Sequence, residues 1–241
     1  MLHLAGSRLL LTDFHNRKVN VVDMDTNSQV SKIGVPGNPW DICLLPGDRV
    51  AVSLASNGIQ FLETREQIVL GYRLLVDGDC RSISYHSDRL IVSYFDGKVT
   101  VLDMNGHVIR GKRRESSRQT VFKMPLNLTV VCENSTAFIY VSDYRKNTIT
   151  KLDMNLNIMK TFQDPALKHP QCITALGNEL LICGSQSNIM ILDLFTGHMT
   201  QLMGEKEGIR KPICVYYCLQ QRKLLVTGQT DSAVKVYNII E

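Results

Sequence analysis

The sequence predicts an all-β fold: a six-bladed β-propeller of four-stranded antiparallel sheets, with an incomplete last sheet and almost no helix. Three observations predict it. One pattern recurs six times, its copies are spaced by about 40 residues, and the copies have the composition of strands. No segment shows a sustained apolar period of 3.6 residues, which a helix would require.

Each copy of the pattern is an apolar run, a polar turn and a second apolar run that usually closes on an acid. Val, Ile, Leu, Tyr and Thr dominate the runs, as in β-hairpins. The closing residues are spaced by 40, 40, 50, 40 and 45 residues, and the longest interval contains an insertion at residues 111–123. The copies cover residues 8–23, 49–63, 89–103, 138–153, 179–193 and 223–238.

Two further short apolar runs accompany the copies, one leading in and one following. The leading runs are residues 41–45, 82–85, 126–132, 172–176 and 213–218, and the following runs are 29–35, 67–72, 107–111, 158–162 and 199–203. Four strands in about 40 residues make one propeller blade, and blades bury their faces only by stacking on neighbours. We therefore expect a single domain over residues 1–241.

The two ends of the chain do not complete a ring of equal sheets. Residues 1–6 suffice for a short inner strand of the first blade, and the sixth copy ends without a fourth strand. We expect an open edge there, and expect this chain to be the C-terminal part of a longer protein.

Composition places the chain among soluble intracellular proteins. It has 241 residues, 44% hydrophobic, a net charge of +4 and an odd number of cysteines, seven. No apolar run reaches the roughly 18 residues of a membrane span, and no secretory signal is visible. We expect a reducing, cytoplasmic location with free thiols, and no membrane partner.

Two segments resemble NHL repeats: Thr12-Asp13-x-x-Asn16-x-x-Val19, and Val141-Ser142-Asp143-Tyr144 with Asn147. Residues 36–42, Pro-Gly-Asn-Pro-Trp-Asp-Ile, resemble the join between such repeats. Other copies lack the aspartate, at Ser53-Leu54, Ser93-Tyr94, Gly184-Ser185 and Gly228-Gln229. The resemblance implies a six-bladed binding platform of the kind found at the C-terminus of tripartite-motif proteins, behind a RING, B-boxes and a coiled coil.

The sequence offers little for catalysis or for metal binding. It has no Cys-x-x-Cys or His-x-x-x-His spacing, no nucleophile elbow and no phosphate-binding loop. A calcium-dependent lactonase would need several oxygen ligands near the axis, where only Asp41, Asn127 and Gln171 are expected. We expect no catalytic residues, metal or cofactor, and we assign Asp23, Glu63, Asp103, Asp153 and Asp193 to turn capping.

Charge is divided between the two faces of the predicted propeller. Turns between second and third strands share a face with the links between blades, and this face carries fourteen basic and ten acidic residues. The opposite face carries six basic and eleven acidic residues. Such asymmetry orients charged partners. The residues predicted to contact a partner are Arg17, Lys98, Lys112, Arg113, Arg114, Arg118, Phe122, Lys123, Tyr144, Arg145, Lys146, Lys168 and Lys211.

The leading hypothesis is a non-catalytic module that recognises a protein through the basic face. The resemblance adds a setting, in which the module selects substrates for a ubiquitin ligase whose RING is absent here. The alternative is binding of single-stranded RNA, because basic residues and aromatic residues such as Phe14, Trp40 and Phe95 are interleaved on that face. A weaker alternative is the lactonase-type hydrolase, and otherwise no small-molecule substrate is expected.

Overall fold

The computed structural model describes residues 1–4, 6–55, 58–112, 121–229 and 233–238, without the side chain of residue 112. Packing divides the chain into two compact units, Met1–Val121 and Phe122–Glu241. Each unit contains three antiparallel sheets and is described by itself.

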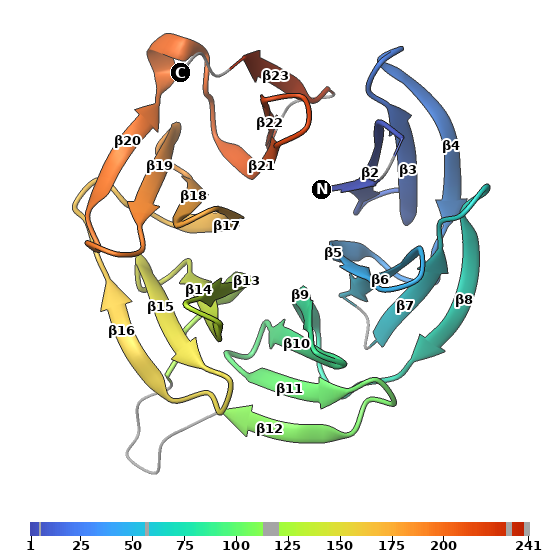
Figure 1. Cartoon of the computed structure of the whole chain (residues 1–241), viewed down its shortest axis with the longest axis horizontal. Coiled ribbons are helices and arrows are strands. Elements are labelled where there is room, and N and C mark those ends of the chain that lie inside the picture. Colours follow the sequence, from blue (N-terminus) through green and yellow to red (C-terminus); the bar gives the residue numbers. More distant parts are fainter. Residues whose placement is uncertain (5, 56–57, 113–120, 230–232, 239–241) are drawn as a thin grey trace. The chain divides into compact units, whose positions relative to one another are not determined.

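The first unit holds three four-stranded sheets (Figure 1). The first sheet is β1 (Leu2–Leu4), β2 (Arg8–Asp13), β3 (Lys18–Asp23) and β4 (Ser28–Gly34). The second is β5 (Pro39–Leu45), β6 (Arg49–Leu54), β7 (Gly58–Glu63) and β8 (Val69–Leu74). The third is β9 (Cys80–His86), β10 (Arg89–Tyr94), β11 (Val99–Asp103) and β12 (Val108–Lys112).

The second unit holds two four-stranded sheets and one of three strands. The fourth sheet is β13 (Pro125–Glu133), β14 (Thr136–Asp143), β15 (Thr148–Asp153) and β16 (Ile158–Phe162). The fifth is β17 (Pro170–Leu176), β18 (Glu179–Gly184), β19 (Asn188–Asp193) and β20 (Met199–Met203). The sixth is β21 (Pro212–Cys218), β22 (Lys223–Gly228) and β23 (Lys235–Asn238).

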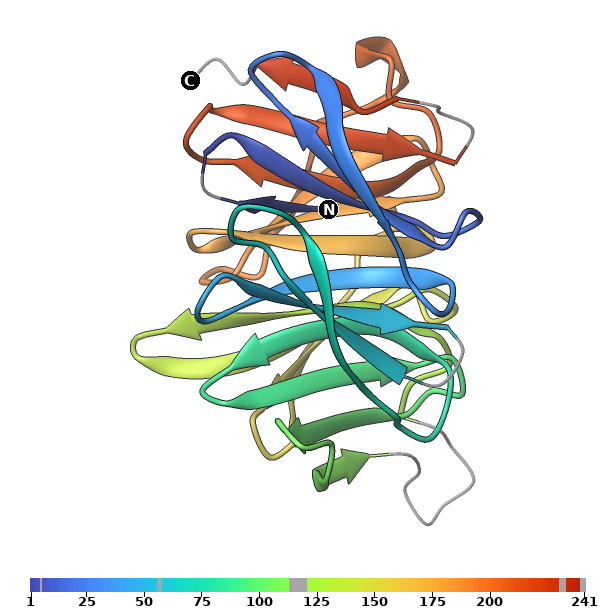
Figure 2. The ribbon, with the colours of Figure 1, turned by 90° about the vertical axis from the view of Figure 1, so that its right-hand side faces the viewer.

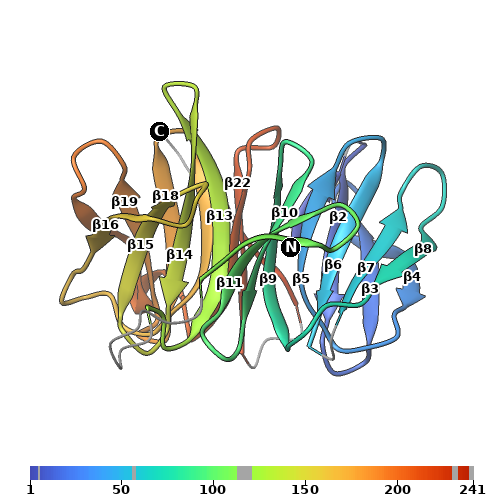
Figure 3. The same cartoon turned by 90° about the horizontal axis from the view of Figure 1, so that it is seen from below.

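These sheets confirm the predicted all-β fold, with six blades of which the last has three strands. Within the described residues the helical structure is one 3₁₀ turn at Glu205–Glu207, so no described helix could cross a membrane. Figure 2 shows β4 and β8 as the outermost strands of their sheets, and Figure 3 shows the turns of each sheet at its two opposite ends.

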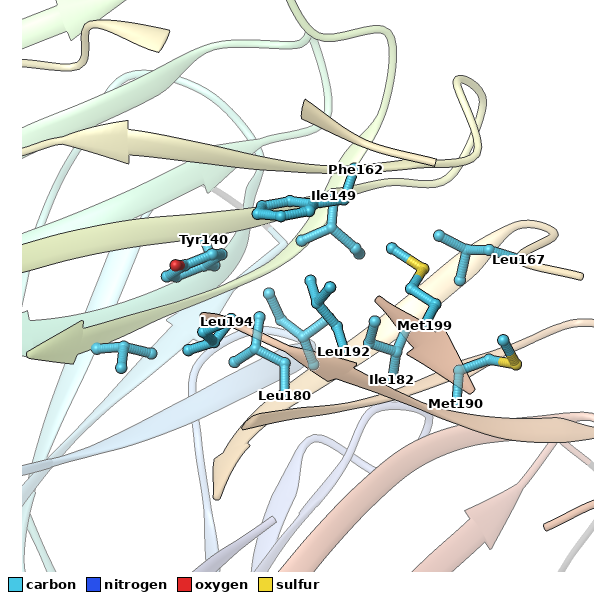
Figure 4. Packing of buried hydrophobic residues seen from close by; sticks show 12 residues of the cluster. Tyr140, Ile149, Phe162, Leu167, Leu180, Ile182, Met190, Leu192, Leu194 and Met199 are labelled. Atoms are coloured by element: carbon cyan, nitrogen blue, oxygen red, sulfur yellow. The ribbon is translucent and has the colours of Figure 1, made fainter. Parts of the chain in front are cut away.

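The hydrophobic core lies between neighbouring sheets of each unit. In β18, Leu180 and Ile182 pack into the cluster shared with the fourth sheet, whereas Leu181 and Cys183 pack into the cluster shared with the sixth. Figure 4 shows the first of these clusters, with Tyr140 and Phe162 facing the fifth sheet. Successive side chains of a strand point to opposite faces, so a middle sheet buries both. This explains why the strands read as continuous apolar runs.

Candidate interaction face

The turns and links predicted to share a face do so in each unit. In five sheets the residue after the second strand donates its N–H to a carbonyl one or two residues before the first strand, at 2.9–3.2 Å. The pairs are Ala55 to Asn38, Phe95 to Asp79, Tyr144 to Met124, Ser185 to Lys168 and Gln229 to Lys211. We call this end of the sheets the turn face. Its backbone is held by repeated hydrogen bonds.

The first strands of the same five sheets change register near the turn face. In β5, Pro39 pairs with Leu54 and Asp41 pairs with Ser53, which leaves Trp40 as the bulged residue. Bulges re-aim side chains and are common beside functional sites. The equivalent residues along the chain are Trp40, Arg81, Leu126, Gln171 and Ile213.

In each unit a residue that follows a bulge ties neighbouring first strands together. The Asp41 carboxylate accepts hydrogen bonds from the Ile83 N–H at 3.3 Å and from the Ser82 hydroxyl. Asn127 Oδ1 accepts the Ile173 N–H at 2.9 Å. Two of the three side chains considered as calcium ligands, Asp41 and Asn127, thus bond between strands. No group of three His, Cys, Asp or Glu side chains able to hold a metal occurs in the described parts of the chain.

Burial raises the pKa of Asp41 above its usual 3.8, and its hydrogen bonds oppose the shift. The folded protein therefore binds more protons than the unfolded chain between 3.8 and the raised pKa, so this group stabilises folding more as the pH falls through that window. We expect Asp41→Ala to cost more stability at about pH 4 than at about pH 7 in urea unfolding. A cost that is equal at both pH values, or smaller at pH 4, would contradict this assignment.

In the first unit, aromatic and cationic side chains form a continuous row on the turn face. Phe14 contacts Trp40 edge-on, with ring centroids 5.3 Å apart. The Arg81 guanidinium lies 4.0 Å from the Trp40 ring centroid and 4.6 Å from that of Phe95. His15 contacts Phe14 at the other end of the row. We call Trp40, Arg81 and Phe95 the arginine clamp.

Arg81 was absent from the predicted contact residues. Its Nε is buried and has no hydrogen-bond partner in the part of the chain that the structure describes. Burial lowers the pKa of Arg81 from its ordinary value, which the Asp79 carboxylate opposes. The predicted strand began at residue 82, two residues after the start of β9 at Cys80, and so left Arg81 out. Alignment with the position of Trp40, one residue before Asp41, is the sequence signal that would have identified Arg81.

Two predicted contact residues have structural roles instead. Phe122 is 1% exposed. An aromatic side chain beside a basic insertion suggested stacking, but its large apolar surface is buried in the core. Lys98 is half-buried, and its ammonium donates to the Asp77 carbonyl at 2.7 Å and lies over the Tyr94 ring.

The other predicted residues fall into three groups. Arg17, Lys123, Arg145 and Lys211 are exposed. Tyr144, Lys146 and Lys168 are half-buried, and Tyr144 stacks on His169 with centroids 4.6 Å apart. Arg113, Arg114 and Arg118 lie outside the described residues, as does the side chain of Lys112.

The fourth sheet shows what the repeat aspartate does. Asp143 is fully buried, and its carboxylate accepts the N–H groups of four residues at 2.7–3.1 Å: Lys123, Met124, Arg145 and Lys146. It thereby joins the link before β13 to the turn after β14. The equivalent Asp13 accepts two hydrogen bonds, both from Asn16.

The opposite end of the sheets carries the predicted capping acids. Four of them each accept the N–H two residues on, at 2.9 Å: Asp23, Asp103, Asp153 and Asp193. These acids are turn caps, as predicted. After Glu63, Thr64 instead donates its N–H and hydroxyl to the Asp48 carbonyl.

Comparison with known proteins supports the fold alone. No protein-family profile matches the chain, and no curated protein matches its sequence. Solved structures do match. They include a streptogramin B lyase (TM-score 0.72, 12% identity, 99% of this chain and 81% of that one). The β-propeller domain of Cps50 (Swd1) from Myceliophteria thermophila matches with a TM-score of 0.68 and 15% identity, covering 98% of this chain and 80% of that one.

A protein of unknown function from Bacteroides caccae matches with a TM-score of 0.70 and 14% identity, covering 95% of this chain and 85% of that one. These similarities and the six sheets define the chain as a six-bladed β-propeller. Its structural relatives include an enzyme and a propeller domain, so the fold does not select a function.

Proposed function

We propose that the chain is a non-catalytic interaction module that recognises a protein partner through the turn face. The bulged position carries the proposal. Residues flanking it repeat: the residue before it is Pro or Cys, and the residue two after it is Ile, Leu or Val in all five strands. The bulged residue itself changes from an aromatic ring to a cation, an amide and aliphatic groups. A scaffold that keeps the residue types one before and two after a re-aimed side chain, while that side chain varies, is suited to specific recognition.

The chemistry of this face fits protein recognition. Arginine and aromatic residues dominate the affinity of protein interfaces, and a rigid backbone reduces the entropy lost on binding. The turn face combines both, since hydrogen bonds hold its turns and the arginine clamp lies among them. Because the repeats of this chain resemble NHL repeats, we extend the proposal to substrate selection for a ubiquitin ligase whose RING lies elsewhere.

Single-stranded RNA is the second candidate. Arg17, Lys123, Arg145 and Lys211 are exposed cations, and Phe95 is an exposed ring. Phosphates would pair with the cations and bases would stack on rings. Binding of this kind weakens steeply as salt increases. We do not extend the proposal to a calcium-dependent hydrolase, because Asp41 and Asn127 already hold neighbouring strands together.

Charge reversal on one face tests the proposal. The double variant Arg17→Glu and Arg145→Glu alters one exposed turn-face cation in each unit, and the matched control Arg89→Glu and Arg222→Glu alters exposed arginines at the opposite end of the sheets. Each immobilised protein would be exposed to nuclease-treated cell lysate, and retained proteins quantified by mass spectrometry. We expect proteins retained by the wild type to fall by about tenfold with the turn-face variant only.

Two outcomes would contradict protein recognition by this face. Equal retention by both double variants would show that the face is wrong. Retention of proteins from untreated lysate but of none from nuclease-treated lysate, with RNA recovered from the untreated lysate at about 0.05 M but not 0.2 M salt, would favour RNA.

A further inference from the structure

We propose that the arginine clamp is a carboxylate-binding site that takes one Asp or Glu side chain of a peptide segment on the partner protein. The inference rests on the proposed function, because it names the chemistry by which the turn face of the first unit would recognise its partner. It adds a site, a ligand class and an anchoring residue.

Two aromatic rings hold the Arg81 guanidinium in place, and its N–H donors are not needed for these contacts. Arg81 lies between Trp40, the bulged residue of the preceding first strand, and Phe95, the first residue after β10. Its backbone is also anchored, since the Arg81 carbonyl accepts the Ser53 hydroxyl at 2.8 Å. Stacking on rings orients the plane of a guanidinium, so the fork of donors is pre-organised.

The donors of Arg81 have no acceptor among the residues that the structure describes. Among the described residues no carboxylate forms an ion pair with Arg81, and its buried Nε has no hydrogen-bond partner. A partly buried cation without an acceptor is unfavourable, because it has lost water and gained no replacement. The Lys98 ammonium, by comparison, donates a hydrogen bond to the Asp77 carbonyl. Arg81 is therefore the cation of this row that is available to an incoming anion.

A carboxylate fits the clamp better than a nucleic-acid backbone. Arginine forks bind carboxylates through two parallel hydrogen bonds. The link beside the clamp carries two exposed acids, Asp77 and Asp79, which repel a chain of phosphates more than one carboxylate. One face of the Trp40 ring and one of the Phe95 ring are also covered by Arg81, which reduces the ring surface open to bases.

The test is a selection of random peptides on the immobilised wild-type propeller, followed by a double-mutant cycle. We expect the selected peptides to share an Asp or Glu at one position. For one such peptide and its isosteric Glu→Gln or Asp→Asn form, affinities would be measured with the wild type and with Arg81→Gln. Either change alone should weaken binding by about 10- to 100-fold, and the second change should add little after the first.

Matched variants separate the clamp from general charge and from folding. Arg89→Gln removes the same charge from the opposite end of β10 and should leave affinity unchanged. Arg81→Lys keeps the charge but not the fork, and should also weaken binding. Thermal unfolding midpoints of all variants would show whether any loss reflects misfolding. Loss with Arg81→Gln but not with Arg81→Lys would overturn the bidentate carboxylate site.

The outcomes distinguish the two proposals. If the wild type selects no peptides, protein recognition itself fails. If it selects peptides without a shared acid, or if the acid and Arg81 contribute independently, the carboxylate site fails while protein recognition stands. If an octauridylate RNA binds with the same dependence on Arg81 and displaces the peptide, the ligand of the clamp is a phosphate and the carboxylate proposal fails.

Discussion

Replacing Asp143 with alanine is expected to lower the free energy of unfolding by about 3–4 kcal/mol. The reason is the number of groups that lose their acceptor at once. Four backbone N–H groups converge on this fully buried carboxylate. Hydrogen bonds to charged acceptors are strong, and a buried donor left unpaired costs its full desolvation. The midpoint of thermal unfolding should fall by about 10 °C.

Asp13→Ala is the matched control, because Asp13 occupies the same repeat position in the first sheet. It is half-buried, and both of its hydrogen bonds come from one residue, Asn16. Its removal should cost less than about 1 kcal/mol. Equal and small costs at the two positions in urea or thermal unfolding would show that Asp143 does not hold the link and the turn together.

Replacing Gly184 with aspartate is expected to destabilise the protein by about 3 kcal/mol, although it would restore the repeat pattern. Gly184 ends β18 at the position that Asp143 occupies in β14. A Cβ on Gly184 would lie 2.5 Å from the Lys168 carbonyl oxygen, closer than real Cβ contacts allow. That oxygen also accepts the Ser185 N–H, so it cannot move without breaking the turn-face hydrogen bond.

Urea unfolding of Gly184→Asp, Gly184→Ala and Gly34→Ala would measure this effect. Gly34 has no atom within 4 Å of its would-be Cβ, so alanine there should change stability by no more than about 0.5 kcal/mol. The repeat pattern alone predicts the opposite for Gly184→Asp, because consensus substitutions usually stabilise. A stabilised Gly184→Asp variant would show that the pattern, and not the packing at Lys168, governs this position.

The strands could be predicted closely because their causes are local. The predicted copies at residues 138–153 and 179–193 coincide with the hairpins β14–β15 and β18–β19, to within two residues. A hairpin pairs residues that are near in sequence, and the period of the apolar pattern records burial directly. The same locality explains the capping acids, since Asp103 and Asp153 bond N–H groups only two residues on.

The composition of the turn face could be predicted only in part. The sequence located the exposed Arg17 and Arg145, but it also selected Phe122, which is buried, and Lys98, whose ammonium is occupied. Lys98 is held by the Asp77 carbonyl in the link before its own sheet, whereas Arg81 stacks on Trp40 of the neighbouring sheet. Both contacts join residues that are more than 20 positions apart, which no local pattern records.

By itself the sequence determined the number of sheets, their strands, the three-stranded sixth sheet and four of the acids that cap the turns. Each of these follows from hydrogen bonds within a hairpin and from periodic burial along a strand. The tertiary structure alone decided that Arg81 lies between Trp40 and Phe95, that Asp143 holds four N–H groups, and that Gly184 has no room for a side chain. These features depend on how a link or a neighbouring sheet packs against a strand, and that packing brings together residues that are distant in sequence.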